Sequence, residues 1–137
     1  MSAAPGDVEL VRQWVRKAEN DLRNAQHTLT LAEDCPYDTV CFHAQQCAEK
    51  YLKGLLAWIG VDCPRTHDLR VLFQALSEPA TLRLEFGRVL MLNRYSVEAR
   101  YPGDWEPITA EEASEAVEVA QEVRSAIRRV LPAAALI

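Results

Sequence analysis

The residues best suited to chemistry in this sequence gather around Arg94. Its planar guanidinium can donate paired hydrogen bonds to a phosphate, and Glu98 follows four residues later, on the same face if the segment is helical. The pair is either an ordinary surface ion pair or a phosphate-binding arginine oriented by a carboxylate. Arg100 would lie about 120 degrees around a regular helix from Arg94 and would point elsewhere.

Two neighbours extend this candidate binding site. Asn93 could read the edge of a base or satisfy a backbone carbonyl, because its amide both donates and accepts hydrogen bonds. Tyr101 precedes Pro102, which biases its backbone away from helical geometry. Its ring could stack on a base or cover the core, and we favour the core.

A polar seam follows the helical spacing of an otherwise apolar segment over residues 39–59. His43, Gln46, Lys50 and Lys53 are separated by steps of three and four residues. The seam is either a solvated stripe or the wall of a cleft or dimer axis. In the second case Lys50 or Lys53 could contact a nucleotide phosphate.

A third candidate lies where a short helix is expected to begin after Thr66. Asp68 suits the positive end of that helix, and His67 with Arg65 could bind an anion there. Local capping of the helix is the favoured interpretation.

Composition limits the kinds of partner. A chain of 137 residues is the size of one domain, and its net charge of −5 argues against a broad basic surface for long nucleic acid. A small local anion pocket remains compatible with that charge. The 4 cysteines include no C-x-x-C pair and no His-x3-5-His follows them, so no metal site is expected. No cofactor is predicted either.

The sequence also predicts a cytoplasmic location without membrane insertion. No secretory signal follows Met1, which favours a reducing compartment with free thiols. The longest apolar runs, such as residues 55–60 and 130–137, are far shorter than the roughly 20 residues that span a bilayer.

Apolar residues at steps of three and four predict an all-helical chain. Long helices are expected over residues 8–32, 39–59 and 79–100, and from 109 to about 131, with a short helix over 67–76. Asp7 and the Thr109–Glu112 capping box mark two helix starts, and Gly60 marks a helix end. The prediction is an antiparallel bundle resembling a four-helix bundle, with a leader at 1–7, one domain at 8–131 and a tail at 132–137.

The helix over 39–59 carries apolar residues around well over half of its circumference. The other helices of a four-helix bundle would not be expected to bury all of this apolar surface. Such a helix is either central in the bundle or covered on one side by a partner subunit. We favour the second and expect a homodimer formed through this helix and the helix over 79–100.

Four segments in this order resemble the HEPN (higher eukaryotes and prokaryotes nucleotide-binding) family. They are WVRKAENDLRNAQ at 14–26, FHAQQCAEKYLKGLL at 42–56, PRTHDL at 64–69 and LNRYSVEARYP at 92–102. The resemblance extends from about residue 10 to residue 130. It implies a compact helical bundle that commonly forms a homodimer and is often encoded beside a minimal nucleotidyltransferase.

Many HEPN proteins are metal-independent ribonucleases with an Arg-x4-6-His signature. In these relatives the arginine holds the scissile phosphate and the histidine moves a proton at the 2′-hydroxyl. Arg94 matches that arginine, but Arg100 stands six residues later, preceded by Glu98 and Ala99. Because a guanidinium stays protonated, Arg100 can bind phosphate but cannot act as a general base.

The leading hypothesis is therefore a HEPN module without standard ribonuclease activity. Its ligand would be a nucleotide or small RNA, or its partner would be a nucleotidyltransferase. The alternative is a toxin-like endoribonuclease in which Arg94 works with a non-standard proton-transfer group, His43 or His67. A third hypothesis is a scaffold whose apolar helix serves only to dimerise.

Overall fold

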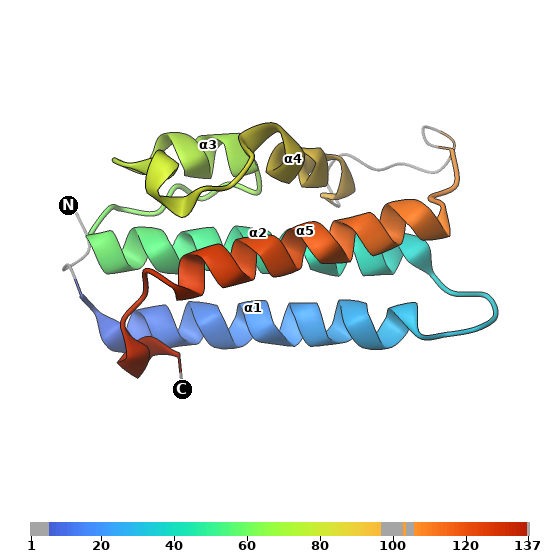
Figure 1. The fold of residues 1–137 in the computed structure, drawn as a ribbon, viewed down its shortest axis with the longest axis horizontal. Coiled ribbons are helices and arrows are strands. Elements are labelled where there is room, and N and C mark those ends of the chain that lie inside the picture. The colour runs from blue at the N-terminus through green and yellow to red at the C-terminus, as the bar shows by residue number, and fades with distance from the viewer. Residues whose placement is uncertain (1–5, 97–102, 104–105, 137) are drawn as a thin grey trace.

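Three long helices form the body of the protein. They are α1 (Val8–Leu29), α2 (Tyr37–Ile59) and α5 (Ala110–Arg128). In Figure 1 these helices lie side by side, with α1 running against α2, and α5 running in the same direction as α2. The structure is a computed structural model that describes residues 6–96, 103 and 106–136.

A limb of short elements connects α2 to α5. It consists of α3 (Leu69–Gln74), the 3-10 turn η1 (Pro79–Leu82), α4 (Phe86–Leu90) and the 3-10 turn η2 (Met91–Tyr95). Figure 1 shows α3 and α4 on the side of α2 away from α1. The chain follows the path of an antiparallel bundle in which this limb takes the place of the third helix and is divided into short pieces. No strand occurs in the described residues. The predicted all-helical fold is confirmed.

Three local sequence signals set helix ends as expected, whereas α2 begins at Tyr37 without a side-chain cap. The Asp7 carboxylate accepts the Leu10 N–H at 3.1 Å and caps α1. Gly60 ends α2 with a φ of 79°, which glycine adopts without steric cost. Thr109 and Glu112 form the predicted capping box at the start of α5. A short turn, η4 (Ala133–Ala135), then packs against α1.

One chain buries α2 more completely than its sequence led us to expect. Tyr51, Leu52 and Leu56 are each 0% exposed, because α1 covers one side of the helix and α5 with the limb covers the rest. Among the large apolar residues of α2, Ile59 is the one that is exposed. The inference that α2 needs a second copy to cover it is therefore wrong. Within the described residues no helix, α2 included, is long and apolar enough to cross a membrane.

The predicted continuous helix over residues 79–100 is also wrong. Arg83 adopts a left-handed conformation with a φ of 55°, and Ser96 is extended with a ψ of 136°. Leu82 and Leu84 are two residues apart, so a continuous helix would point them about 200 degrees apart. The break allows both to pack against the core. Helical spacing consequently cannot be extended from Arg94 past Ser96.

Candidate functional site

Arg94 occupies the end of the limb, on η2 (Met91–Tyr95). Its side chain is exposed, and its guanidinium carbon lies 6.0 Å from the centre of the Tyr95 ring. Tyr95 itself is buried, and this burial raises the pKa of its hydroxyl to about 12. The hydroxyl therefore remains protonated, and the Tyr95 ring packs beneath the arginine. The other predicted members of this group, Glu98, Arg100 and Tyr101, lie outside the described residues.

Asn93 connects the backbone beside Arg94 to the start of α3. Its Oδ1 accepts the Leu69 N–H at 2.8 Å, and its Nδ2 donates to the Asp68 carboxylate at 2.9 Å. Asp68 also caps α3 by accepting the Arg70 N–H at 2.9 Å. The Asn93 amide thus joins two elements of the limb. Among the described residues, the partners of this amide are a backbone N–H and a carboxylate rather than a backbone carbonyl.

His67 lies just before α3, rather than in its first turn as predicted, and is held by a buried carboxylate on α2. Its Nδ1 is 3.0 Å from Oε1 of Glu49, which is only 2% exposed. Gln45 donates to the His67 carbonyl at 3.1 Å, and Thr66 accepts the Asp68 N–H at 3.0 Å. Asp68 also accepts a hydrogen bond from Asn93. His67 and Arg94 are the chain neighbours of these two bonded residues.

The predicted polar seam on α2 does not form one surface. Asp21 of α1 accepts hydrogen bonds from Lys50 and lies 2.8 Å from the His43 ring, so both side chains turn toward α1. Lys53 instead donates to Glu49 at 3.0 Å and lies 5.5 Å from the centre of the Trp14 ring. Each predicted cation is therefore already paired within the bundle.

The structure thus divides the predicted site residues into two groups. Arg94, Asn93 and His67 come together where η2 meets α3. His43 and Lys50 lie on the α1 side of α2, whereas Lys53, whose side chain is only 11% exposed, bonds the same Glu49 carboxylate as His67 of the first group. The α3–η2 junction, defined by Asn93, Arg94, His67 and Asp68, is the candidate phosphate-binding surface.

Sequence reasoning missed a second polar cluster that connects the three long helices. Arg124 of α5 donates to the Glu19 carboxylate of α1 through Nε at 2.7 Å and Nη2 at 3.1 Å. The Tyr51 hydroxyl of α2 donates to the same carboxylate and accepts from Arg128 at 3.2 Å. A hydroxyl within the apolar stripe of α2 was the one available signal, because a buried tyrosine oxygen needs a partner.

The charges of this cluster determine its titration. Burial tends to raise the pKa of Glu19, but hydrogen bonds from Arg124 and Tyr51 and the charges of Arg124 and Arg128 outweigh it and lower that pKa below 4.5. Burial and the bond to Glu19 raise the pKa of Tyr51. Burial also raises the pKa of the nearby Cys47 thiol, which is therefore a poor nucleophile.

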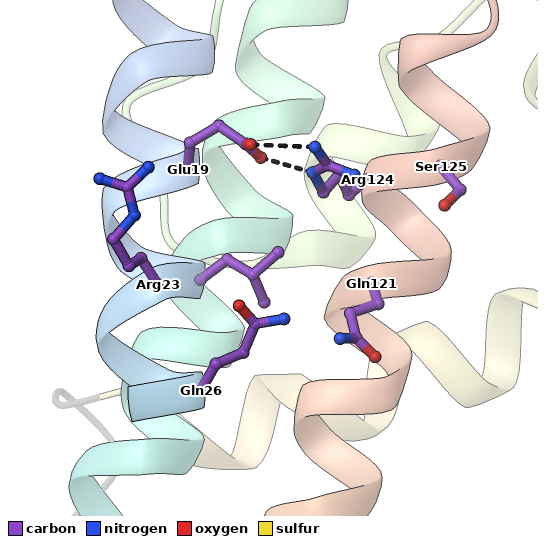
Figure 2. A pocket seen from close by; sticks show the side chains of 7 residues that line it. Glu19, Arg23, Gln26, Gln121, Arg124 and Ser125 are labelled. Carbon is purple, nitrogen blue, oxygen red and sulfur yellow. Dashed lines mark hydrogen bonds and ion pairs between the residues drawn. The ribbon is translucent and has the colours of Figure 1, made fainter. Parts of the chain in front are cut away.

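A polar hollow of about 470 Å³ opens beside this cluster, between α1 and α5. Figure 2 shows the Glu19–Arg124 pair at one end, with Gln26 and Gln121 farther along on opposite sides. The described residues contain no group of three or more His, Cys, Asp or Glu side chains that could hold a metal ion.

The chain belongs to the HEPN family, because the model of the HEPN domain matches residues 11–130. The crystal structure of TT1696 from Thermus thermophilus is similar at 32% identity and a TM-score of 0.71, covering 88% of this chain and 98% of that one. ST0689, an archaeal HEPN homologue, is similar at 28% identity and a TM-score of 0.68, covering 87% and 95% of the respective chains. No curated protein matches the chain.

The substitution Glu19→Gln should destabilise the protein by about 1–2 kcal/mol at neutral pH, because it removes a charged acceptor from Arg124 and Tyr51. Since the folded-state pKa of Glu19 is lowered, its stabilising effect is complete above its ordinary pKa of 4.5 and disappears as the pH falls through the folded-state value. Urea unfolding across that acidic range should therefore show a steeper loss for the wild type than for the variant. The control Glu33→Gln, at an exposed loop position, should match the wild type.

Proposed function

We propose that this chain is a HEPN module that binds a nucleotide or a short RNA through Arg94 without cleaving it. The observation that carries the proposal is the position of Arg94, exposed on a turn whose backbone is held to α3 by Asn93. A planar guanidinium on a fixed backbone is suited to a phosphate, because less conformational freedom is lost when the phosphate binds.

The surroundings of Arg94 favour an anion of limited length. His67 precedes Asp68 in the chain, and its half-exposed ring is oriented by Glu49, so an imidazole that can donate a hydrogen bond lies beside the α3–η2 junction. Lys50 is engaged by Asp21, and Lys53 is engaged by Glu49, the carboxylate that also holds His67. A chain of net charge −5 with one such surface fits a few phosphates better than a long duplex.

Absence of cleavage follows from proton chemistry. The chain contains 3 histidines, at positions 27, 43 and 67, and none follows Arg94. The arginine at position 100 cannot accept a proton at neutral pH. Phosphate can therefore be held, while the 2′-hydroxyl lacks the base that the family's ribonucleases use.

The substitution Arg94→Ala should weaken binding of a short oligoribonucleotide by about tenfold or more, because a charge-assisted bidentate contact is lost. Isothermal titration measures the loss directly. Arg16→Ala removes another exposed arginine, from α1, and should leave the affinity unchanged. Equal binding by both variants would show that Arg94 is not the phosphate ligand.

A homodimer and a minimal nucleotidyltransferase partner are further parts of the proposal, and both follow from the family. Because α2 is covered within one chain, the support for a dimer comes instead from the limb. Phe86 and Met91 are each 39% exposed there, and apolar side chains exposed on the same limb could form part of an interface.

Light scattering should give twice the chain mass at micromolar concentration, and Met91→Glu should shift the population toward monomer. A wild type that remains monomeric would remove the dimer from the proposal. Titration with a nucleotidyltransferase encoded beside this chain tests the partner separately, because Met91→Glu need not affect that contact.

A metal-independent endoribonuclease is the second candidate function, and one observation favours His67 over His43 in it. His67 flanks the contact beside Arg94 and has its ring oriented by the Glu49 carboxylate. A carboxylate in this position can stabilise the protonated ring during proton transfer. His43 lies on the α1 side of α2 with Asp21.

Clean protein incubated with oligoribonucleotides and a chelator distinguishes the two functions. Binding without cleavage is the outcome expected from the leading proposal. Cleavage that is abolished by Arg94→Ala and by His67→Ala, but retained in His43→Ala, would establish the enzyme. Cleavage that all three variants retain would point to a contaminating nuclease.

A further inference from the structure

The hollow between α1 and α5 has a polar lining to which the proposed function gives no role. Its volume of about 470 Å³ falls within the range of small-ligand sites. None of the residues that line it belongs to the limb that carries Arg94. The hollow is therefore separate from the α3–η2 junction.

The lining contains hydrogen-bonding side chains that are available to a ligand. Gln26 of α1 and Gln121 of α5 lie on opposite sides of the hollow in Figure 2, and Arg23 is on α1, three residues before Gln26. Across the described part of the chain, none of these three side chains has an ion pair or a hydrogen bond. In the adjoining cluster, Tyr51 and Arg124 both donate hydrogen bonds to Glu19.

The charge of the lining favours an anion. Among the described residues, Glu19 is the one carboxylate that lines the hollow, and its charge is matched by the bidentate pair with Arg124. The guanidinium of Arg23 therefore gives the hollow an excess positive charge, although the chain as a whole has a net charge of −5. An anionic group of a ligand would be attracted to the rim formed by Arg23.

We propose that this hollow, which we name the α1–α5 groove, binds a mononucleotide. Arg23 would hold the phosphate, and the amides of Gln26 and Gln121 would bond the edge of the base, as glutamine does with the N6 and N7 atoms of adenine. Leu22 supplies an apolar surface in the same lining. The ligand class rests on the proposed function, but the location and the residues do not.

Three variants test the α1–α5 groove in the full chain with AMP as the probe. Arg23→Gln and Gln121→Ala remove the two kinds of contact at exposed positions, so neither should disturb folding. Lys17→Gln is the matched control, because it removes one positive charge from an exposed position on the same helix outside the groove. Adenosine and inorganic phosphate serve as the two halves of the ligand.

Isothermal titration should show AMP binding that falls about tenfold in each groove variant and is unchanged in Lys17→Gln. Adenosine and phosphate should each bind more weakly than AMP. In nitrogen–proton NMR spectra, AMP should shift the side-chain amide signals of Gln26 and Gln121. Arg94→Ala should retain the affinity for AMP at the groove.

Other outcomes overturn the inference. No AMP binding at millimolar concentration would remove it, and phosphate binding as tightly as AMP would exclude a nucleotide as the ligand. AMP binding that is lost in Arg94→Ala but kept in Arg23→Gln and Gln121→Ala would also overturn it, while supporting the proposed function. The proposed function is tested separately, by comparing oligoribonucleotide binding to the wild type and to Arg94→Ala.

Discussion

The buried carboxylate of Glu49 is the constraint on which the arrangement of the limb depends. A charge that is only 2% exposed costs several kcal/mol unless it is paired and hydrogen-bonded. Glu49 meets this requirement with Lys53 from its own helix and His67 from the connector, while Gln45 bonds both Glu49 and the backbone of His67. The start of α3 is thereby fixed against α2, and Asn93 transmits that position to the turn that carries Arg94.

The long helices could be predicted from the sequence because their signals are local. The period of the apolar residues and the caps at Asp7 and Thr109 act within a few positions along the chain. The third limb could not be predicted in the same way. Leu82 and Leu84 each pack against the core, and this tertiary requirement overrides the helical preference of the residues between Pro79 and Ser96.

The individual residues of the candidate site could be named from the sequence, but their association could not, because Arg94 and Asn93 were predicted in one group and His67 and Asp68 in another. Sequence spacing grouped His43 with Lys50 correctly, and both contact Asp21. The same spacing added Lys53, which is turned toward Glu49 by a small rotation around the helix. The Glu19–Arg124 pair joins residues 105 positions apart, and no local pattern reports such a contact.

The division of the third limb into pieces of four to six residues has a consequence for how the molecule opens. Helices so short are not stable alone and persist only while they are docked. Amide hydrogens of the limb can therefore exchange with solvent through partial openings that leave α1, α2 and α5 intact. Opening of the segment that carries Arg94 would then cost less free energy than unfolding the whole protein.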